Sequence, residues 1–168
     1  TSMMSAYIEQ GQGRKALLLY RQMREEGVKP DHQTIVTALQ ACGLLAEDEE
    51  PIILGPQSIK VKCFNVGRAL HADACSNDLC LLDDVSMATT LVDMYSKCGA
   101  IEDAEHVFSA LNRPDVVSWN TILGGCQRWG ERELANEAFE HAMFLADNNA
   151  AVYVSMSNVY ANIDDTMK

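Results

Sequence analysis

The sequence has no long apolar segment and few basic residues. No run approaches the roughly 18 apolar residues that a membrane-spanning helix needs, so we expect no membrane insertion. The 13 Lys and Arg face 24 Asp and Glu, and a net charge of −11 counts against a simple nucleic-acid binder with a broadly basic surface. Residues 1–41 carry five basic and four acidic side chains, whereas residues 42–168 carry eight and twenty. The acidic part is suited to repel RNA or to face a basic protein.

Patterns typical of catalytic, cofactor or metal sites are missing as well. There is no phosphate loop, no nucleophile elbow and no pair of carboxylates placed for acid–base chemistry. The six Cys form no C-x-x-C pair, and Cys42, Cys98 and Cys126 fall at small apolar positions of helical patterns. We interpret the Cys as free thiols of a reducing compartment. Cys75 and Cys80 are spaced C-x4-C without a partner pair, so we expect no zinc, no cofactor and no enzyme.

Instead, the sequence contains an internal repeat. Three stretches show an apolar helical pattern, a short polar turn with Gly, and a second helical pattern with Ala five residues after that Gly. Gly supplies the left-handed residue that ends the first helix, and Ala lets the two helices approach closely. The turn glycines and their alanines are Gly11 and Ala16, Gly99 and Ala104, and Gly130 and Ala135.

The spacing of the residues that precede each turn predicts the size of the repeat. The spacings are 35, 53, 31 and 34, for the anchors Tyr7, Cys42, Tyr95, Cys126 and Tyr160. Three of them fit a helical hairpin of about 34 residues, and the long one indicates an insertion. One hairpin cannot bury its apolar face alone. We therefore predict an all-α fold, a right-handed α-solenoid of stacked helix-turn-helix repeats.

We expect the insertion to be a surface loop over about residues 43–65. Pro51 and Pro56 break any helix there, and the acidic run AEDEE is typical of a solvated segment. A helix is expected to resume near residue 66, in VGRALHADAC.

Three segments resemble the pentatricopeptide repeat family, and specifically its plant-type PLS class with alternating motif lengths. They are EEGVKPD at 25–31, LVDMYSKCGAIEDAEHVF at 91–108 and PDVVSWNTIL at 114–123. The resemblance covers nearly the whole chain outside the insertion. It implies single-stranded RNA binding in an organelle, with one base read by each repeat.

The resemblance also divides the chain into five units. Residues 1–31 resemble a standard motif truncated at its start, and 32–84 resemble a long-type motif carrying the inserted loop. Residues 85–115 resemble a short-type motif. Residues 116–149 resemble a PPR or E-like motif, and 150–168 resemble the start of a further tetratricopeptide-like E motif. Such C-terminal motifs are often involved in protein contacts.

In this family, the fifth and last residues of each motif select the RNA base. The positions that match are Thr1 with Asp31 and Thr89 with Asp115. This Thr and Asp combination favours guanine, since a hydroxyl and a carboxylate together satisfy a purine edge. Asn120 takes the fifth position of the last motif, where Asn favours a pyrimidine.

The interrupted motif departs from the pattern, because its pair is Val36 and Asp84, which matches no clear code. The position that stacks between bases in the family is held here by Gln33, Ser86 and Val117, so it is polar in two of three motifs. Lys97 and Arg128 match the position that often faces an RNA phosphate. The net order that the resemblance implies is guanine, any base, guanine, pyrimidine.

Each of these residues also has a structural interpretation. Asp31 and Asp115 are suited to cap the N-terminus of the helix that follows, and Thr89 to be an ordinary first-turn residue. Trp119 and Trp129 are candidates to stack on bases, but packing is the commoner role for a residue such as Trp119.

The resemblance thus implies a sequence-selective RNA-binding protein of a mitochondrion or chloroplast, an adaptor in RNA editing, processing or stabilisation. The alternative is a non-catalytic structural or scaffold subunit of a large organellar complex, with the acidic C-terminal part as its contact surface. Some relatives carry a cytidine deaminase domain, but its H-x-E and C-x-x-C motifs are absent here. The chain begins without Met and without a signal or transit pattern, so we expect a fragment of a longer protein.

Overall fold

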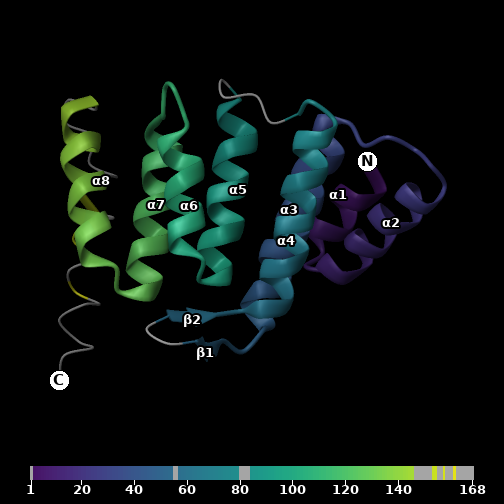
Figure 1. The fold of residues 1–168 in the computed structure, drawn as a ribbon, viewed down its shortest axis with the longest axis horizontal. Helices are drawn as coiled ribbons and strands as arrows, with labels where there is room; N and C mark the ends of the chain where they lie inside the picture. Colours follow the sequence, from purple (N-terminus) through teal and green to yellow (C-terminus); the bar gives the residue numbers. More distant parts are fainter. Residues whose placement is uncertain are drawn as a thin grey trace.

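The described residues fold into four helical hairpins that stack side by side, with a small β-hairpin inside the second (Figure 1). The computed structural model describes residues 2–54, 57–79, 84–145, 153–154, 157 and 161. The hairpins are α1 (Ser2–Glu9) with α2 (Gly13–Glu25), α3 (His32–Asp48) with α4 (Val61–Ser76), α5 (Val85–Cys98) with α6 (Ile101–Ser109), and α7 (Val116–Trp129) with α8 (Arg132–Leu145). This arrangement confirms the predicted all-α solenoid.

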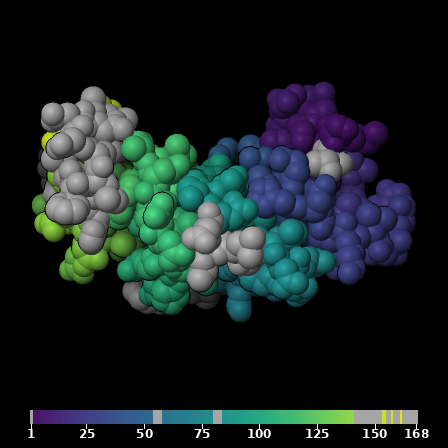
Figure 2. Space-filling model, turned by 90° about the horizontal axis from the view of Figure 1, so that it is seen from above, coloured from purple at the N-terminus to yellow at the C-terminus, as the bar shows by residue number. Residues whose placement is uncertain are grey.

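The helices form two layers. The inner layer consists of the first helix of each hairpin, α1, α3, α5 and α7, each packed against the next. The outer layer consists of the second helices, α2, α4, α6 and α8. Three of these also pack against the inner helix of the following hairpin: α2 on α3, α4 on α5 and α6 on α7. Seen from above, α1 stands out at one end of the molecule, and α3 and α5 follow it along the same side (Figure 2).

The core is shared between hairpins rather than enclosed by any one of them. Its largest fully buried side chains come from the inner layer: Ile35, Leu39, Met87, Met94, Ile122 and Leu123. The predicted small residues Ala16, Ala104 and Ala135 have no exposed surface. Among the described residues, no helix combines the length and apolar character needed to cross a membrane.

The insertion is shorter and more ordered than the loop expected over about 43–65. Helix α3 continues to Asp48, because Ala46 still packs into the core. Strand β1 (Ile52–Leu54) then pairs antiparallel with β2 (Gln57–Ile59), and α4 begins at Val61 rather than near residue 66. The carboxylate of Glu49 explains this early start, since it accepts hydrogen bonds from the first backbone N–H groups of α4.

The β-hairpin contacts the turn of the next repeat, so it is not a free excursion into solvent. The backbone N–H of Lys60 donates to the carbonyl of Cys98 at 2.8 Å. The Lys60 ammonium donates to the carbonyl of Ala46, near the end of α3. The carbonyl oxygen of Ser58 lies so close to Gly99 that a Cβ on Gly99 would be 2.3 Å from it. The insertion therefore joins the second hairpin to the third.

Replacing Gly99 by Ala tests this contact. Gly99 and Gly130 both end an inner helix with positive φ, +83° and +77°, but a Cβ on Gly130 would meet nothing within 4 Å. We expect Gly130→Ala to lower the free energy of unfolding by about 1 kcal/mol, the backbone cost alone. Gly99→Ala adds the clash with Ser58 and should cost roughly 1 kcal/mol more. Urea unfolding followed by circular dichroism measures both, and equal losses would contradict the contact.

Candidate nucleic-acid interface

An Asp stands immediately before each of the three inner helices α3, α5 and α7. Each carboxylate caps its helix by accepting a hydrogen bond from the backbone N–H three residues on. The donors and distances are Thr34 to Asp31 at 2.7 Å, Met87 to Asp84 at 3.0 Å, and Ser118 to Asp115 at 2.8 Å. The structural interpretation of Asp31 and Asp115 as helix caps is therefore confirmed, and it places the three carboxylates at corresponding points of successive repeats.

The predicted pair Thr89 and Asp115 is brought together through Ser118. The Ser118 hydroxyl donates to Asp115 Oδ1 at 2.8 Å, and Thr89 Oγ1 lies 3.0 Å from Ser118 Oγ. Because Ser118 uses its proton on Asp115, Thr89 is the donor in the second bond. Both the cap and the Ser118 bond use Oδ1 of Asp115, so Oδ2 takes no part in them. A hydroxyl and a carboxylate oxygen thus lie on either side of Ser118.

Asp31 repeats this arrangement two motifs earlier, at the end of the first motif. Both the backbone N–H and the hydroxyl of Thr34 donate to Asp31 Oδ1, at 2.7 Å and 2.5 Å. Thr34 therefore corresponds to Ser118. The predicted partner of Asp31, Thr1, lies outside the described residues.

The interrupted motif is built differently. Asp84 Oδ1 caps α5, but Oδ2 lies 2.6 Å from Nε2 of His32, the first residue of α3. Val36, at the fifth position of this motif, is buried in the core. The interrupted motif therefore combines a carboxylate that lies against an imidazole with a buried apolar side chain.

The two predicted phosphate contacts differ in their surroundings. The Lys97 ammonium lies 2.8 Å from Asp93 and 3.5 Å from Glu47, and the side chain is only 19% exposed. A phosphate at Lys97 would have to compete with two carboxylates. Arg128 is exposed in the last turn of α7. Across the inner layer, four acidic side chains accompany these two basic ones: Glu9, Glu47, Asp48 and Asp93.

The remaining predicted residues have distinct positions. Asn120 is half-buried on α7. The three predicted base-stacking positions, Gln33, Ser86 and Val117, are exposed. Trp119 is a packing residue, since its ring meets that of Phe108 edge-on with 4.5 Å between centroids.

Sequence reasoning missed Thr34, Ser118 and His32. The first two were detectable, because a hydroxyl residue three positions after an Asp is a common pattern at a helix start. His32 meets Asp84 across 52 positions of sequence, and nothing local indicates that contact.

The remaining candidates for chemistry are the cysteine thiols and a metal site. Burial raises the pKa of the Cys126 thiol to about 12, and it is also the first cause that raises the pKa of Cys63 to about 12. Both thiols are therefore protonated and poor nucleophiles at neutral pH. Within the described part of the chain, no group of three or more His, Cys, Asp or Glu side chains is placed to hold a metal ion. Cys80 of the C-x4-C pair lies outside that part.

Comparisons with known proteins agree with the repeat architecture. A profile of the PPR repeat family matches residues 1–43, and a PPR repeat profile matches residues 86–113. A chloroplastic pentatricopeptide repeat-containing protein of Arabidopsis thaliana is 35% identical over 163 residues, which is 96% of this chain and 27% of the relative. A mitochondrial one is 33% identical over 139 residues, which is 83% of this chain and 13% of the relative. Another pentatricopeptide repeat-containing protein of Arabidopsis thaliana is 32% identical over 143 residues, which is 85% of this chain and 17% of the relative. The chain thus spans about a quarter or less of these relatives.

The hydrogen bonds at Asp31 and Asp115 predict different responses to loss of the neighbouring hydroxyl. The pKa of Asp31 is lowered chiefly by the Thr34 hydroxyl, whereas that of Asp115 is lowered chiefly by the backbone N–H of Ser118. We expect Thr34→Val to raise the pKa of Asp31 toward its ordinary value, and Ser118→Ala to raise that of Asp115 by less. Carboxyl NMR titration measures both shifts.

The same substitution should alter the acid sensitivity of the fold. A lowered carboxyl pKa contributes stability above the unfolded-state pKa, and that stability is lost as pH falls through the lower folded-state value. Thr34→Val should therefore reduce the loss of stability on acidification. Thr121→Ala is the control, because its hydroxyl bonds the backbone of Val117 and neither Asp. A larger pKa rise at Asp115 than at Asp31 would contradict the assignment.

Proposed function

Because the chain belongs to the pentatricopeptide repeat family, we propose that it binds single-stranded RNA in a mitochondrion or chloroplast along its inner layer. The relatives named chloroplastic and mitochondrial support the organellar location. Helical repeats of this kind read one base with a few side chains each.

The arrangement of Thr89, Ser118 and Asp115 carries the proposal. Guanine presents N–H donors on its Watson–Crick edge. A carboxylate oxygen of Asp115 can accept from them, and so can the hydroxyl oxygen of Thr89, whose proton is used on Ser118. Asp115 is suited to this role because burial is slight and the Ser118 N–H holds its pKa below the ordinary range. The carboxylate is thus ionised at neutral pH, and the cap fixes its position.

The repeats differ in what they offer a base. Asp31 and Asp115 share the hydroxyl-supported cap, whereas Asp84 is engaged by His32 and its motif partner Val36 is buried. These contacts favour a guanine at the first and third repeats and no selection at the second. Asn120 would add a pyrimidine preference at the fourth.

In the cell, we propose a non-catalytic adaptor role in RNA editing, processing or stabilisation. Membership of the PLS class, the motif boundaries at 31, 84, 115 and 149, and the E-like nature of the last units are part of this proposal. The supporting observation is that α3, α5 and α7 each begin one residue after the first three of those boundaries.

A scaffold role in a large organellar complex is the second candidate. The charge of the inner layer favours it, since four acidic residues outnumber two basic ones and Lys97 is paired with both Glu47 and Asp93. Such a surface gives RNA little long-range attraction.

Conservative substitution of the capping Asp residues tests base selection. Asn caps a helix about as well as Asp, but its amide presents a donor where guanine needs an acceptor. We expect Asp31→Asn and Asp115→Asn to retain stability. Each should lower the preference for guanine roughly tenfold at the RNA position that its repeat reads. Fluorescence anisotropy with oligouridine carrying guanine at one position measures this preference.

Asp84→Asn is the matched control, and it should leave base preference unchanged. An equal effect at Asp84 would contradict the assignment of base selection to the hydroxyl-supported caps. Failure of the unsubstituted chain to bind any of these oligonucleotides would reject RNA binding and favour the scaffold function.

The salt dependence of RNA binding tests the phosphate contacts. Each phosphate contact to a single strand contributes about −0.7 to the slope of log K against log salt, so two basic residues predict a slope of roughly −1.4 or shallower. Arg128→Ala should make the slope about 0.7 shallower. Lys97→Ala should change it less, because Lys97 already pairs with Asp93 and Glu47. Anisotropy titrations over a range of salt give the slopes, and a larger change for Lys97→Ala would contradict this ranking.

A further inference from the structure

An apolar groove lies on the outer layer, between α2 and α4. Its volume is about 770 Å³, within the roughly 300–1,000 Å³ that is common for ligand sites. Helix α2 contributes Leu17 and Leu18, α4 contributes Val66 and Leu70, and Leu45 of α3 is also in the lining. Leu18 is 58% exposed and Val66 is 40% exposed. These two apolar side chains face solvent on the outer layer, away from the proposed RNA surface of the inner layer.

The residues along the groove follow helical spacing on both sides. On α2 they are Arg14, Leu17, Leu18, Tyr20, Arg21 and Arg24, and on α4 they are Val66, Ala69, Leu70, Ala72, Asp73 and Ser76. Each set forms one stripe along its helix, since residues three and four apart lie on the same face. Arg14 and Arg24 are ten positions apart on α2, a rise of about 15 Å, so the groove is elongated.

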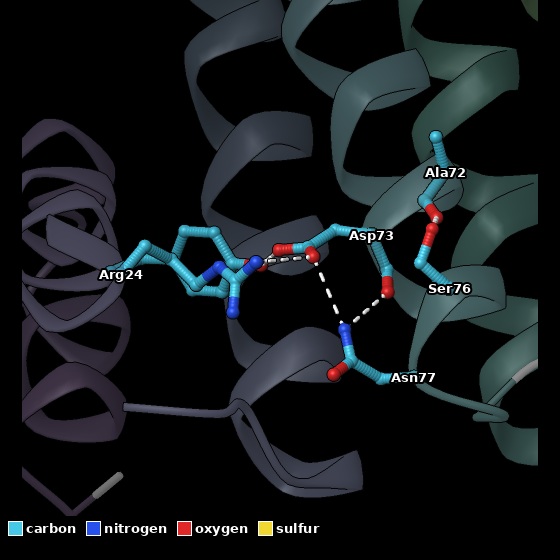
Figure 3. A network of polar contacts seen from close by, with 6 residues as sticks. Arg24, Ala72, Asp73, Ser76 and Asn77 are labelled. Atoms are coloured by element: carbon cyan, nitrogen blue, oxygen red, sulfur yellow. Dashed lines mark hydrogen bonds and ion pairs between the residues drawn. The ribbon is translucent and has the colours of Figure 1, made fainter. Parts of the chain in front are cut away.

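A polar bridge holds the two helices together at one end of the groove (Figure 3). Arg24 lies 2.9 Å from Asp73 Oδ1, and the Tyr20 hydroxyl donates to Asp73 Oδ2. The Asn77 amide donates to the backbone carbonyl of Asp73 at 2.7 Å and to its carboxylate at 3.2 Å. Asp73 is therefore satisfied from three side chains, and the bridge fixes the separation of α2 and α4 where they meet.

The α2 side of the groove is lined by three basic residues, Arg14, Arg21 and Arg24, in a chain whose net charge is −11. Arg24 is held by Asp73, so Arg14 and Arg21 supply the positive charge of this rim. Arg21 pairs with Glu25 at 2.8 Å, but both side chains are largely exposed, and such pairs hold their partners weakly. An occupant with acidic groups along this flank would be complementary to it.

We propose that the α2–α4 groove binds an amphipathic helix of a partner protein, with an apolar face in the groove and acidic residues along the flank of α2. The elongated apolar floor matches the row of side chains that such a helix presents at every third or fourth position. RNA fits less well, because Tyr20 is the one aromatic residue among the described residues that line the groove, and its hydroxyl is used by Asp73. The site lies on the opposite layer from the proposed RNA surface, so the two proposals stand independently.

The test uses a designed, fluorescein-labelled peptide of about 16 residues, long enough to cover the groove as a helix. Leucines at every third or fourth position form its apolar face, and glutamates line one flank. A second peptide replaces the glutamates by lysines. We expect saturable binding of the acidic peptide by anisotropy, and binding of the lysine peptide weaker by roughly tenfold or more. Hydrogen exchange should slow in α2 and α4 when the acidic peptide is bound.

Two exposed substitutions in the groove provide the matched comparison. Leu18→Glu should weaken the acidic peptide roughly tenfold or more, and Arg21→Glu should weaken it by about threefold or more. The same changes outside the groove, Val28→Glu and Lys29→Glu, should have no effect, since both residues are exposed in the connection between α2 and α3. Circular dichroism confirms that each variant is folded.

Several outcomes would overturn the proposal. They are no saturable binding, equal affinity for the two peptides, or equal effects of the groove and control substitutions. Competition by single-stranded RNA would assign the basic rim to nucleic acid. A dimer in sedimentation equilibrium that Leu18→Glu dissociates would assign the groove to self-association instead.

Discussion

The stacking of α3, α5 and α7 is the contact on which the rest of the structure depends. The helices approach one another at small residues. A Cβ on Gly125 of α7 would lie 2.5 Å from the Ser96 hydroxyl oxygen of α5, and a Cβ on Gly43 of α3 would lie 3.2 Å from Cδ of Lys97. Large apolar side chains such as Leu39 and Ile122 fill the space between these points and are fully buried. Because the close approach sets the distance between repeats, it also sets the distance between the Asp caps at the helix starts.

The caps combine a structural role with the proposed recognition role. In each of the three, Oδ1 accepts the backbone N–H of the new helix, so the fold itself orients the carboxylate. What distinguishes the repeats is the group beside the cap. Thr34 and Ser118 add a second bond to the same Oδ1, whereas His32 takes the other oxygen of Asp84. A sequence code based on Asp alone therefore describes less than the structure, because the neighbours decide which carboxylate oxygen remains available.

The sequence predicted those features that depend on neighbours along the chain. The Gly turns, the buried Ala residues and the helical hairpins follow from spacing within about 34 residues, and all are present in the described part of the chain. The last anchor of the predicted period, Tyr160, lies outside that part. The errors lie where distant residues meet. Glu49 caps an N-terminus 13 positions away, which starts α4 early, and the β-hairpin is held by Cys98 and Gly99 of the next repeat. The pair of His32 with Asp84 and the groove between α2 and α4 likewise need the stacked fold, so no local pattern indicates them.

The scarcity of positive charge on the inner layer limits what that face can bind. The inner layer has only two basic residues on its helices, and one of them is held by two carboxylates, so RNA bound there would rely on short-range hydrogen bonds. Such bonds discriminate between bases but attract from a distance only weakly. Arg14, Arg21 and Arg24 of α2 cannot supply that attraction to the inner face, because they line an apolar groove on the outer layer. An acidic, amphipathic protein surface instead matches this combination of positive charge and exposed leucine. Because the groove is on the outer layer, a protein bound there leaves the inner layer open to RNA.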